Sequence, residues 1–327
     1  MNWLMVGAFA LHIVVSLVLY NFPDMFEIGI LLNLSLGEIM LLLPMVVYLL
    51  CWKLGQGKYA DEAGDNAEAE KPQTLRERLH YNKVKPTTIL YALIFTWLSM
   101  PLTTLINAIS MLFVDNTVME LSGQILGVAF PVMLFFMAVV PAFCEETLFR
   151  GIVYGGYRKH GNKFVAVMLS GFLFGVMHMN LNQALYAFAI GVLLALLFEA
   201  TNSIWPTILF HFVYNAQSCC LMYFVEEIVP GFYSNPDNIA MATETASLYS
   251  MIAAYIIIAA IFTPLAICML YKIAKNEGRV EQLKETGAQV QILINNAGFG
   301  RLGDFDTISK DDNAGMVRLN CEALTVM

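Results

Sequence analysis

Long apolar runs separated by short polar segments dominate this chain. A helix rises ~1.5 Å per residue, so about 20 apolar residues cross the ~30 Å of a bilayer's hydrocarbon core. The pattern predicts an all-α, polytopic transmembrane bundle of about eight spans, of which the fifth and sixth have the shortest apolar parts. The predicted spans are Trp3 to Phe22, Ile28 to Trp52, Thr88 to Val114, Ile125 to about Tyr157, Phe164 to about Leu181, Ala184 to Glu199, Ile204 to Phe224 and Ala246 to Tyr271.

Composition supports this class and charge predicts its orientation. Hydrophobic residues make up 58% of the chain and charged residues 13%, against about a quarter charged in soluble proteins. Lys and Arg gather in two loops and in the C-terminal part, whereas the opposite loops carry only acids. Basic loops accumulate on the cytoplasmic side, so we expect an integral protein of a bacterial cell membrane with both termini cytoplasmic. The net charge of -8 indicates no particular partner, and no nucleic acid.

Two polar segments interrupt or follow the spans. Residues 53–87 include DEAGDNAEAEKPQ, which is too poor in apolar residues to fold alone and predicts a mobile cytoplasmic linker. The chain becomes soluble in character near residue 276, where a short helix over Gly278 to Thr286 is expected. We therefore divide the chain into a transmembrane domain, residues 1–275, and a short α/β-like tail, residues 276–327.

The tail resembles a fragment of the short-chain dehydrogenases. The run GAQVQILINNAGFG is similar to the fourth strand and NNAG motif of that family, and MVRLNCEALTVM to the helix that bears its asparagine, here Asn320. The glycine-rich dinucleotide loop is absent upstream, where a membrane span stands, and the YxxxK pair is absent downstream. We therefore expect no NAD(P) binding, and a membrane-tethered dehydrogenase is the disfavoured hypothesis.

The stretch CEETLFRG places three charges at the end of an uncharged apolar run. Ionisable groups within spans are costly, so they tend to be paired or functional. Glu146 and Arg150 stand at i and i+4, a spacing that suits an ion pair. Glu145 points about 100° away from that face and has no such local partner. An unpaired carboxylate at this depth suits a general base that works near neutral pH.

Three further polar residues lie at comparable depth on other predicted helices. His178 falls near the end of the fifth span, and His211 and Asn215, at i and i+4, share one face of the seventh. The sequence therefore predicts an intramembrane cluster with acid, imidazole and amide chemistry. His12 and Glu38, in the first two spans, are expected to be structural, with a substrate or gating role for Glu38 as the alternative.

Three ordered motifs carry a resemblance to a known family: EETLFR fits EExxxR, FGVMH fits FxxxH, and HFVYN fits HxxxN. Over a motif core of residues 132–218 they resemble the CPBP family of CAAX proteases and bacteriocin-processing proteins, which includes the type II CAAX prenyl endopeptidases. The resemblance implies that Glu145 activates water with help from His178, while His211 and Asn215 stabilise the oxyanion. Glu146 and Arg150 would organise the site.

The sequence is compatible both with a zinc site and with catalysis that needs no metal. The family is commonly classed as metalloproteases, and Glu145, His178 and His211 could supply a His₂Glu zinc site. No HExxH motif is present, however, and a metal-bound Glu145 would need another base. We favour water activated by glutamate and histidine, with no obligatory cofactor.

These features favour a membrane endopeptidase acting on a peptide or membrane-protein substrate in the bilayer. The alternative is a non-catalytic protein that binds a peptide or confers bacteriocin immunity through the same cavity.

Two other features are expected to be structural. Glu199 lies near a cytoplasmic span end, where it can reach water, and Gly151 and Gly155 have the spacing of helix–helix packing.

Overall fold

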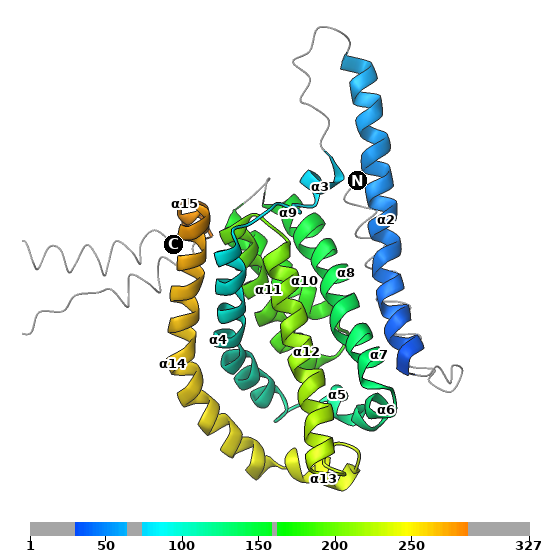
Figure 1. Cartoon of the computed structure of the whole chain (residues 1–327), viewed down its shortest axis with the longest axis vertical. Coiled ribbons are helices and arrows are strands. Elements are labelled where there is room, and N and C mark those ends of the chain that lie inside the picture. Colours follow the sequence, from blue (N-terminus) through cyan, green and yellow to red (C-terminus); the bar gives the residue numbers. More distant parts are fainter. Residues whose placement is uncertain (1–29, 64–73, 159–161, 287–327) are drawn as a thin grey trace, which may run out of the picture.

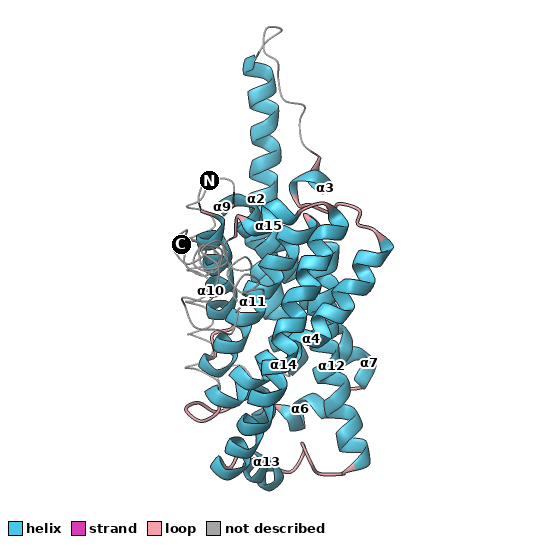
Figure 2. Ribbon diagram, turned by 90° about the vertical axis from the view of Figure 1, so that its left-hand side faces the viewer, coloured by secondary structure: helices cyan, strands magenta, loops and turns pink. Residues whose placement is uncertain are grey.

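The computed structural model describes residues 30–63, 74–158 and 162–286, and every regular element in these ranges is a helix (Figure 2). The predicted all-α membrane bundle is therefore confirmed for this part of the chain. Six of its helices are long and apolar enough to cross a membrane. They are Gly37–Leu54 within α2 (Ile30–Ala63), α4 (Pro86–Ser110), the composite helix Phe130–Tyr157, α11 (Leu181–Thr201), α12 (Trp205–Ile228) and α14 (Thr245–Glu277). The first predicted span, residues 3–22, and the dehydrogenase-like motifs lie outside the described residues.

The fifth predicted span is shorter than expected. Helix α10 runs over Lys163–Met177, and its 15 residues cover roughly 22 Å at ~1.5 Å per residue, less than a full crossing. Its neighbour α11 is longer than the sequence predicted and qualifies as a span. The Asn180 side chain separates the two helices, because its Oδ1 accepts the N–H of Gln183 at 2.8 Å and so caps α11.

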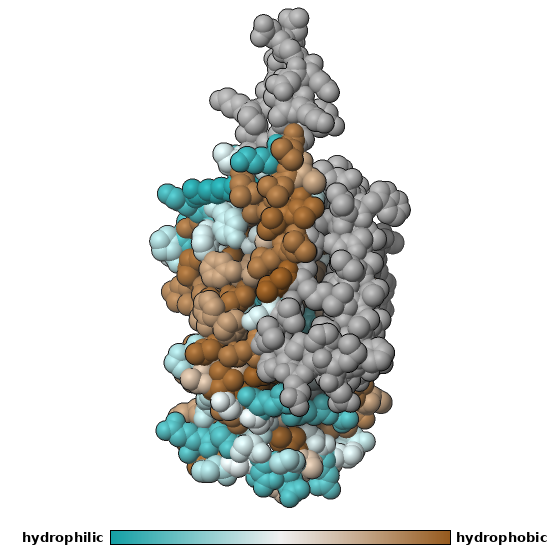
Figure 3. Space-filling view, turned by 90° about the vertical axis from the view of Figure 1, so that its right-hand side faces the viewer, coloured by the Kyte–Doolittle hydropathy of each residue, from teal (hydrophilic) through white to brown (hydrophobic). Residues whose placement is uncertain are grey.

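The helices form a bundle whose two ends differ in character. Short helices α3 (Leu75–Arg78), α9 (Gly155–Tyr157) and α15 (Val280–Lys284) lie at one end, and α5 (Thr117–Glu120), α6 (Ser122–Leu126) and α13 (Pro236–Ala242) at the other (Figure 1). Helix α2 runs alongside the composite helix and extends beyond the first end. On the face shown in Figure 3, apolar side chains occupy the surface between the ends, and hydrophilic ones gather around the α13 end.

Residues 64–73, which hold most of the stretch that predicted a mobile linker over residues 53–87, lie outside the described residues, but the prediction is wrong for the segments on either side. Residues 53–63 continue α2, and the segment that leads into α4 is fastened to the turn between α11 and α12. The Asn82 Nδ2 donates to the Asn202 carbonyl at 2.7 Å, and Ser203 Oγ donates to the Asn82 carbonyl at 2.6 Å. Side-chain capping and tertiary hydrogen bonds therefore order a segment whose composition alone predicts none.

Glycines 151 and 155 pack against that same segment rather than against another helix. A Cβ added at Gly151 would lie 3.2 Å from the Leu79 side chain, and one at Gly155 would lie 3.8 Å from the His80 ring. The expectation of helix–helix packing at these two positions is corrected accordingly.

Glu199 is buried, with 1% exposure, instead of reaching water. Its carboxylate lies 3.1 Å from Arg158, 3.3 Å from Lys163 and 3.2 Å from Arg279. Three cations around one carboxylate hold α10, α11 and the segment after α14 together. The predicted boundary at residue 275 therefore falls inside α14, and the chain up to residue 286 packs on the bundle.

Candidate active site

The composite helix Phe130–Tyr157 is not a regular α-helix. It consists of α7 (Phe130–Leu134), a π-helical segment η3 (Phe135–Val139), α8 (Val140–Glu146), a second π-helical segment η4 (Thr147–Tyr154) and α9. The π-helix has wider turns with i→i+5 hydrogen bonds, is rare, and recurs at functional sites. The two π segments bracket α8, which carries both glutamates of the EExxxR motif.

Glu146 and Arg150 form the predicted ion pair at the junction of α8 and η4. Both side chains are fully buried, and Arg150 Nη1 donates to Glu146 Oε1 at 2.7 Å. The guanidinium also donates through Nη2 to the Gly191 carbonyl at 3.0 Å and lies 4.6 Å from the ring centroid of Phe174. The pair therefore ties the EExxxR helix to α11 through Gly191 and to α10 through Phe174, two partners that the sequence did not predict.

His211 on α12 lies between the two glutamates. Its Nδ1 is 3.1 Å from Glu146 Oε1, and its Nε2 is 4.0 Å from Glu145 Oε2. Glu145 is 7% exposed, and its Oε2 is buried without a hydrogen-bond partner among the described residues. Glu146 thus orients the imidazole, and Nε2 faces a carboxylate oxygen across a gap in which one water molecule could bridge the two groups.

His178 lies at the end of α10 and shares an aromatic neighbour with His211. Its Nδ1 is 2.8 Å from the Phe174 carbonyl, so this nitrogen is the donor and Nε2 carries the free lone pair. The Phe174 ring packs edge-on against both imidazoles, at centroid distances of 5.2 Å to His178 and 5.8 Å to His211. The phenylalanine of the FxxxH motif therefore links the two histidines.

Asn215 has a role that the sequence did not predict. Its Nδ2 donates to the Met137 carbonyl in η3 at 3.0 Å. Helix α12 consequently contacts the composite helix twice, through His211 at α8 and through Asn215 at η3. This contact uses one of the two amide hydrogens of Asn215.

Close approach of α10 and α11 sets the position of the FxxxH motif. A Cβ added at Gly191 would lie 2.8 Å from the Gly171 Cα, and one at Gly175 would lie 2.6 Å from the Ala184 carbonyl oxygen. Only glycine permits such contacts between backbones. They place Phe174 beside Arg150 and direct the Gly191 carbonyl toward the same guanidinium.

The structure brings the predicted residues together unequally. Glu145, Glu146, Arg150 and His211 form one contiguous cluster, while His178 joins it through Phe174. No group of three or more His, Cys, Asp or Glu side chains in the described ranges lies close enough to hold a metal ion. The residues as placed therefore do not fit the zinc site considered from the sequence.

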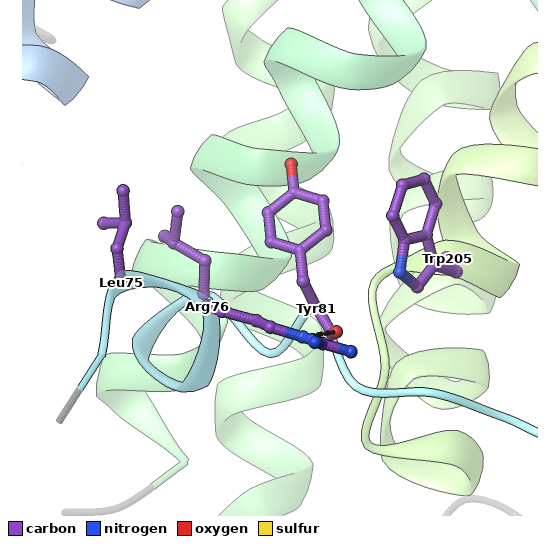
Figure 4. A pocket seen from close by; sticks show the side chains of 5 residues that line it. Leu75, Arg76, Tyr81 and Trp205 are labelled. Carbon is purple, nitrogen blue, oxygen red and sulfur yellow. Dashed lines mark hydrogen bonds between the residues drawn. The ribbon is translucent and has the colours of Figure 1, made fainter.

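Two apolar cavities share Trp205, the first residue of α12. One, of about 490 Å³, is lined by Leu75, Arg76, Leu79, Tyr81 and Trp205 (Figure 4). The other, of about 610 Å³, is lined mainly by side chains of the composite helix and α12, among them Phe143 and Phe212. The second cavity is therefore lined by the two helices that carry Glu145 and His211.

Tyr81 connects the first cavity to the EExxxR helix. Its hydroxyl is 2.8 Å from Thr147 Oγ1, and its ring packs against Trp205 at a centroid distance of 5.3 Å. Burial raises the pKa of the Tyr81 phenol, so the hydroxyl remains a hydrogen-bonding group at neutral pH.

Comparison with known proteins agrees with this site. Residues 127–217 match the family model described as type II CAAX prenyl endopeptidase Rce1-like. A protein of Bacillus subtilis (strain 168) described as "Putative membrane peptidase YdiL" is 33% identical over 87 residues, which are 27% of this chain and 36% of that relative. The chain thus matches little more than a third of the relative's length. No solved structure gives a significant match.

The matched segment contains all three motifs and every residue of the cluster. The match agrees with the resemblance to the CPBP family that the motifs carry. Together with the six apolar helices, the match supports an integral membrane protein.

Proposed function

We propose that the protein is an intramembrane endopeptidase in which Glu145 activates a water molecule for attack on a peptide carbonyl. The observation that carries the proposal is the buried Glu145 Oε2, which has no hydrogen-bond partner among the described residues and faces His211 Nε2 at 4.0 Å. A carboxylate without a structural partner is costly within a membrane span. Binding and deprotonating a water molecule gives the Glu145 carboxylate a role, whereas its contacts within the fold give it none.

The reaction follows from the positions of the acceptors and donors. Water between Glu145 and His211 loses a proton to the Glu145 carboxylate as its oxygen bonds to the carbonyl carbon. The carbonyl oxygen becomes negative and accepts hydrogen bonds from His211 Nε2–H and from the second N–H of Asn215. The C–N bond then breaks, and the proton held by Glu145 passes to the leaving amine. Donors placed in this way contribute about 3–4 kcal/mol each to such transition states.

The remaining site residues position these groups. Glu146 accepts a hydrogen bond from His211 Nδ1–H, so His211 acts as the oxyanion donor through Nε2–H in its doubly protonated imidazolium form, while Arg150 neutralises Glu146. His178, with Nδ1 held by the Phe174 carbonyl, assists the activation of water through Nε2. No metal is needed for these steps, and metal analysis of the purified, active protein tests that expectation.

The substrate we propose is a peptide or a membrane-associated protein. Apolar cavities of about 490 and 610 Å³, both lined by Trp205 of α12, the helix that carries His211, support an occupant that approaches from the bilayer. Arg76, Lys83, Arg158 and Arg279 belong to segments at the α3, α9 and α15 end (Figure 1). This placement supports the proposal that this end is cytoplasmic.

The test compares cells that carry the wild type or Glu145→Gln. Quantitative proteomics of membranes and released peptides should find products that require the wild type and vanish with Glu145→Gln. Glu227→Gln, which removes an exposed carboxylate from α12, is the matched control and should leave the products unchanged. Products that persist at equal levels with Glu145→Gln would refute the assignment.

A second function is favoured by one observation, the hydrogen bond from Asn215 to the Met137 carbonyl. It directs one amide N–H away from a substrate carbonyl, which agrees with a protein that binds a peptide or confers immunity without hydrolysis. This function predicts a binding or immunity phenotype that survives Glu145→Gln and His211→Ala.

A further inference from the structure

Glu38 on α2 is a carboxylate that the proposed reaction does not use. It lies outside residues 127–217, the segment matched by the family model. Leu41 and Met45 follow it at i+3 and i+7, are 6% and 9% exposed, and pack into the main apolar core. Residues at this spacing share one helix face, so Glu38 belongs to the face of α2 that packs on the bundle.

That face places Glu38 beside the catalytic carboxylate. Helix α2 packs against α8, the helix that carries Glu145, and the Glu38 and Glu145 carboxylates are close enough to interact electrostatically. Glu38 Oε2 and Glu145 Oε2 are both buried, and both lack a hydrogen-bond partner within the described part of the chain. Two helices therefore bring two unsatisfied carboxylate oxygens into the same part of the bundle.

Glu145 faces His211 Nε2 at 4.0 Å, whereas Glu38 has no cationic partner among the described residues. Arg150, the basic residue nearest in sequence to Glu145, is committed to Glu146 and to the Gly191 carbonyl. No ion pair joins Glu38 to a Lys or Arg within residues 30–63, 74–158 and 162–286. Like charges held together away from water repel each other, and a cation between them removes the repulsion.

We propose that Glu38 is a specificity-determining residue that binds the basic side chain of a substrate, a Lys or an Arg close to the scissile bond. The inference rests on the proposed endopeptidase function and adds the substrate class to it. The cation enters with the substrate, its charge is balanced by Glu38, and its position beside Glu145 brings the adjoining peptide bond to the activated water.

The experiment uses the full chain in lipid nanodiscs and an internally quenched peptide library. Each flanking position carries Lys, Gln or Glu in turn on a fixed scaffold. We expect the wild type to prefer Lys over Gln at one position by about tenfold or more in kcat/KM, as a hydrogen bond to a charged group provides. Glu38→Gln should abolish this preference while Gln peptides are cleaved as before. Glu38→Asp, which keeps the charge, should retain part of the preference for Lys, and Glu227→Gln should retain the full preference.

Several outcomes would overturn the proposal. These are a wild type indifferent to Lys, a preference that survives Glu38→Gln, and a loss of cleavage in Glu38→Gln that is equal for all peptides. The last would assign Glu38 to the chemical step or to folding.

A binding measurement distinguishes this inference from the proposed endopeptidase function. His178→Ala, which keeps both carboxylates, should still bind Lys peptides more tightly than Gln peptides, and His178→Ala with Glu38→Gln should not. That result would hold even if the wild type hydrolysed nothing.

Discussion

Replacement of Gly191 by alanine tests whether the α10–α11 contact positions the catalytic cluster. The new Cβ would lie 2.8 Å from Gly171 Cα and 3.1 Å from Phe174 Cβ, whereas ordinary contacts begin at 3.4 Å. The helices must therefore separate by at least about 0.6 Å, the difference between 3.4 and 2.8 Å. Overpacking of this kind costs ~1–3 kcal/mol, and alanine in a helix returns ~0.5–1 kcal/mol, so the net loss is about 0–2.5 kcal/mol.

The effect on catalysis should exceed the effect on stability. The shift moves Phe174, which contacts both imidazoles, and the Gly191 carbonyl, which accepts from Arg150. A displacement of ~1 Å can cost about 10²-fold in rate, so we expect a fall of that order in kcat while most of the protein stays folded.

The assay measures peptide cleavage and reversible unfolding in mixed micelles for the same preparations. Gly156→Ala is the matched control, because nothing lies within 4 Å of a Cβ at that position. It should leave activity unchanged. Wild-type activity in Gly191→Ala, or equal losses in both variants, would refute the reasoning.

Three further predictions concern other contacts. Arg150→Leu removes the arginine partner of the buried Glu146, which keeps only its contact with His211, and should cost about 3–5 kcal/mol of unfolding free energy. Arg150→Leu with Glu146→Gln should cost less than the single change, and additive losses would contradict a direct pair. Glu199→Gln should release the segment around Arg279, seen as faster proteolysis after Gly278; unchanged protection would show that Glu199 does not hold it. Asn215→Ala should lower kcat by about 10²-fold with little change in KM, and an unaltered kcat would remove this amide from the transition state.

The sequence predicted the parts of the site that depend on spacing within one helix. Glu146 and Arg150 are four residues apart, so their pairing follows from helix geometry and is confirmed at 2.7 Å. The three motifs also identified the family segment that the comparison confirms. The class of fold was equally predictable, because the length of an apolar run sets whether a helix can span a bilayer.

Contacts between helices were not predictable in the same way. The hydrogen bond of His211 to Glu146, and the one from Arg150 to Gly191, depend on the rotation of α12 and α11 about their axes, which spacing alone does not set. The π-helical segments have no compositional signature. The Phe in FxxxH and the glycines of α10 and α11 were the sequence features that could have indicated the close packing of these two helices. The residue that each glycine contacts, however, is known only from the three-dimensional arrangement of the helices.

The central claim is that Glu145 activates a water molecule that cleaves a peptide bond. The most direct test is single-turnover cleavage of a quenched peptide library by the purified chain in nanodiscs, in oxygen-labelled water. We predict that the wild type places one label in the new carboxylate of the product, and that Glu145→Gln, folded to the same extent, forms no product. Cleavage by folded Glu145→Gln at the wild-type rate would contradict the account.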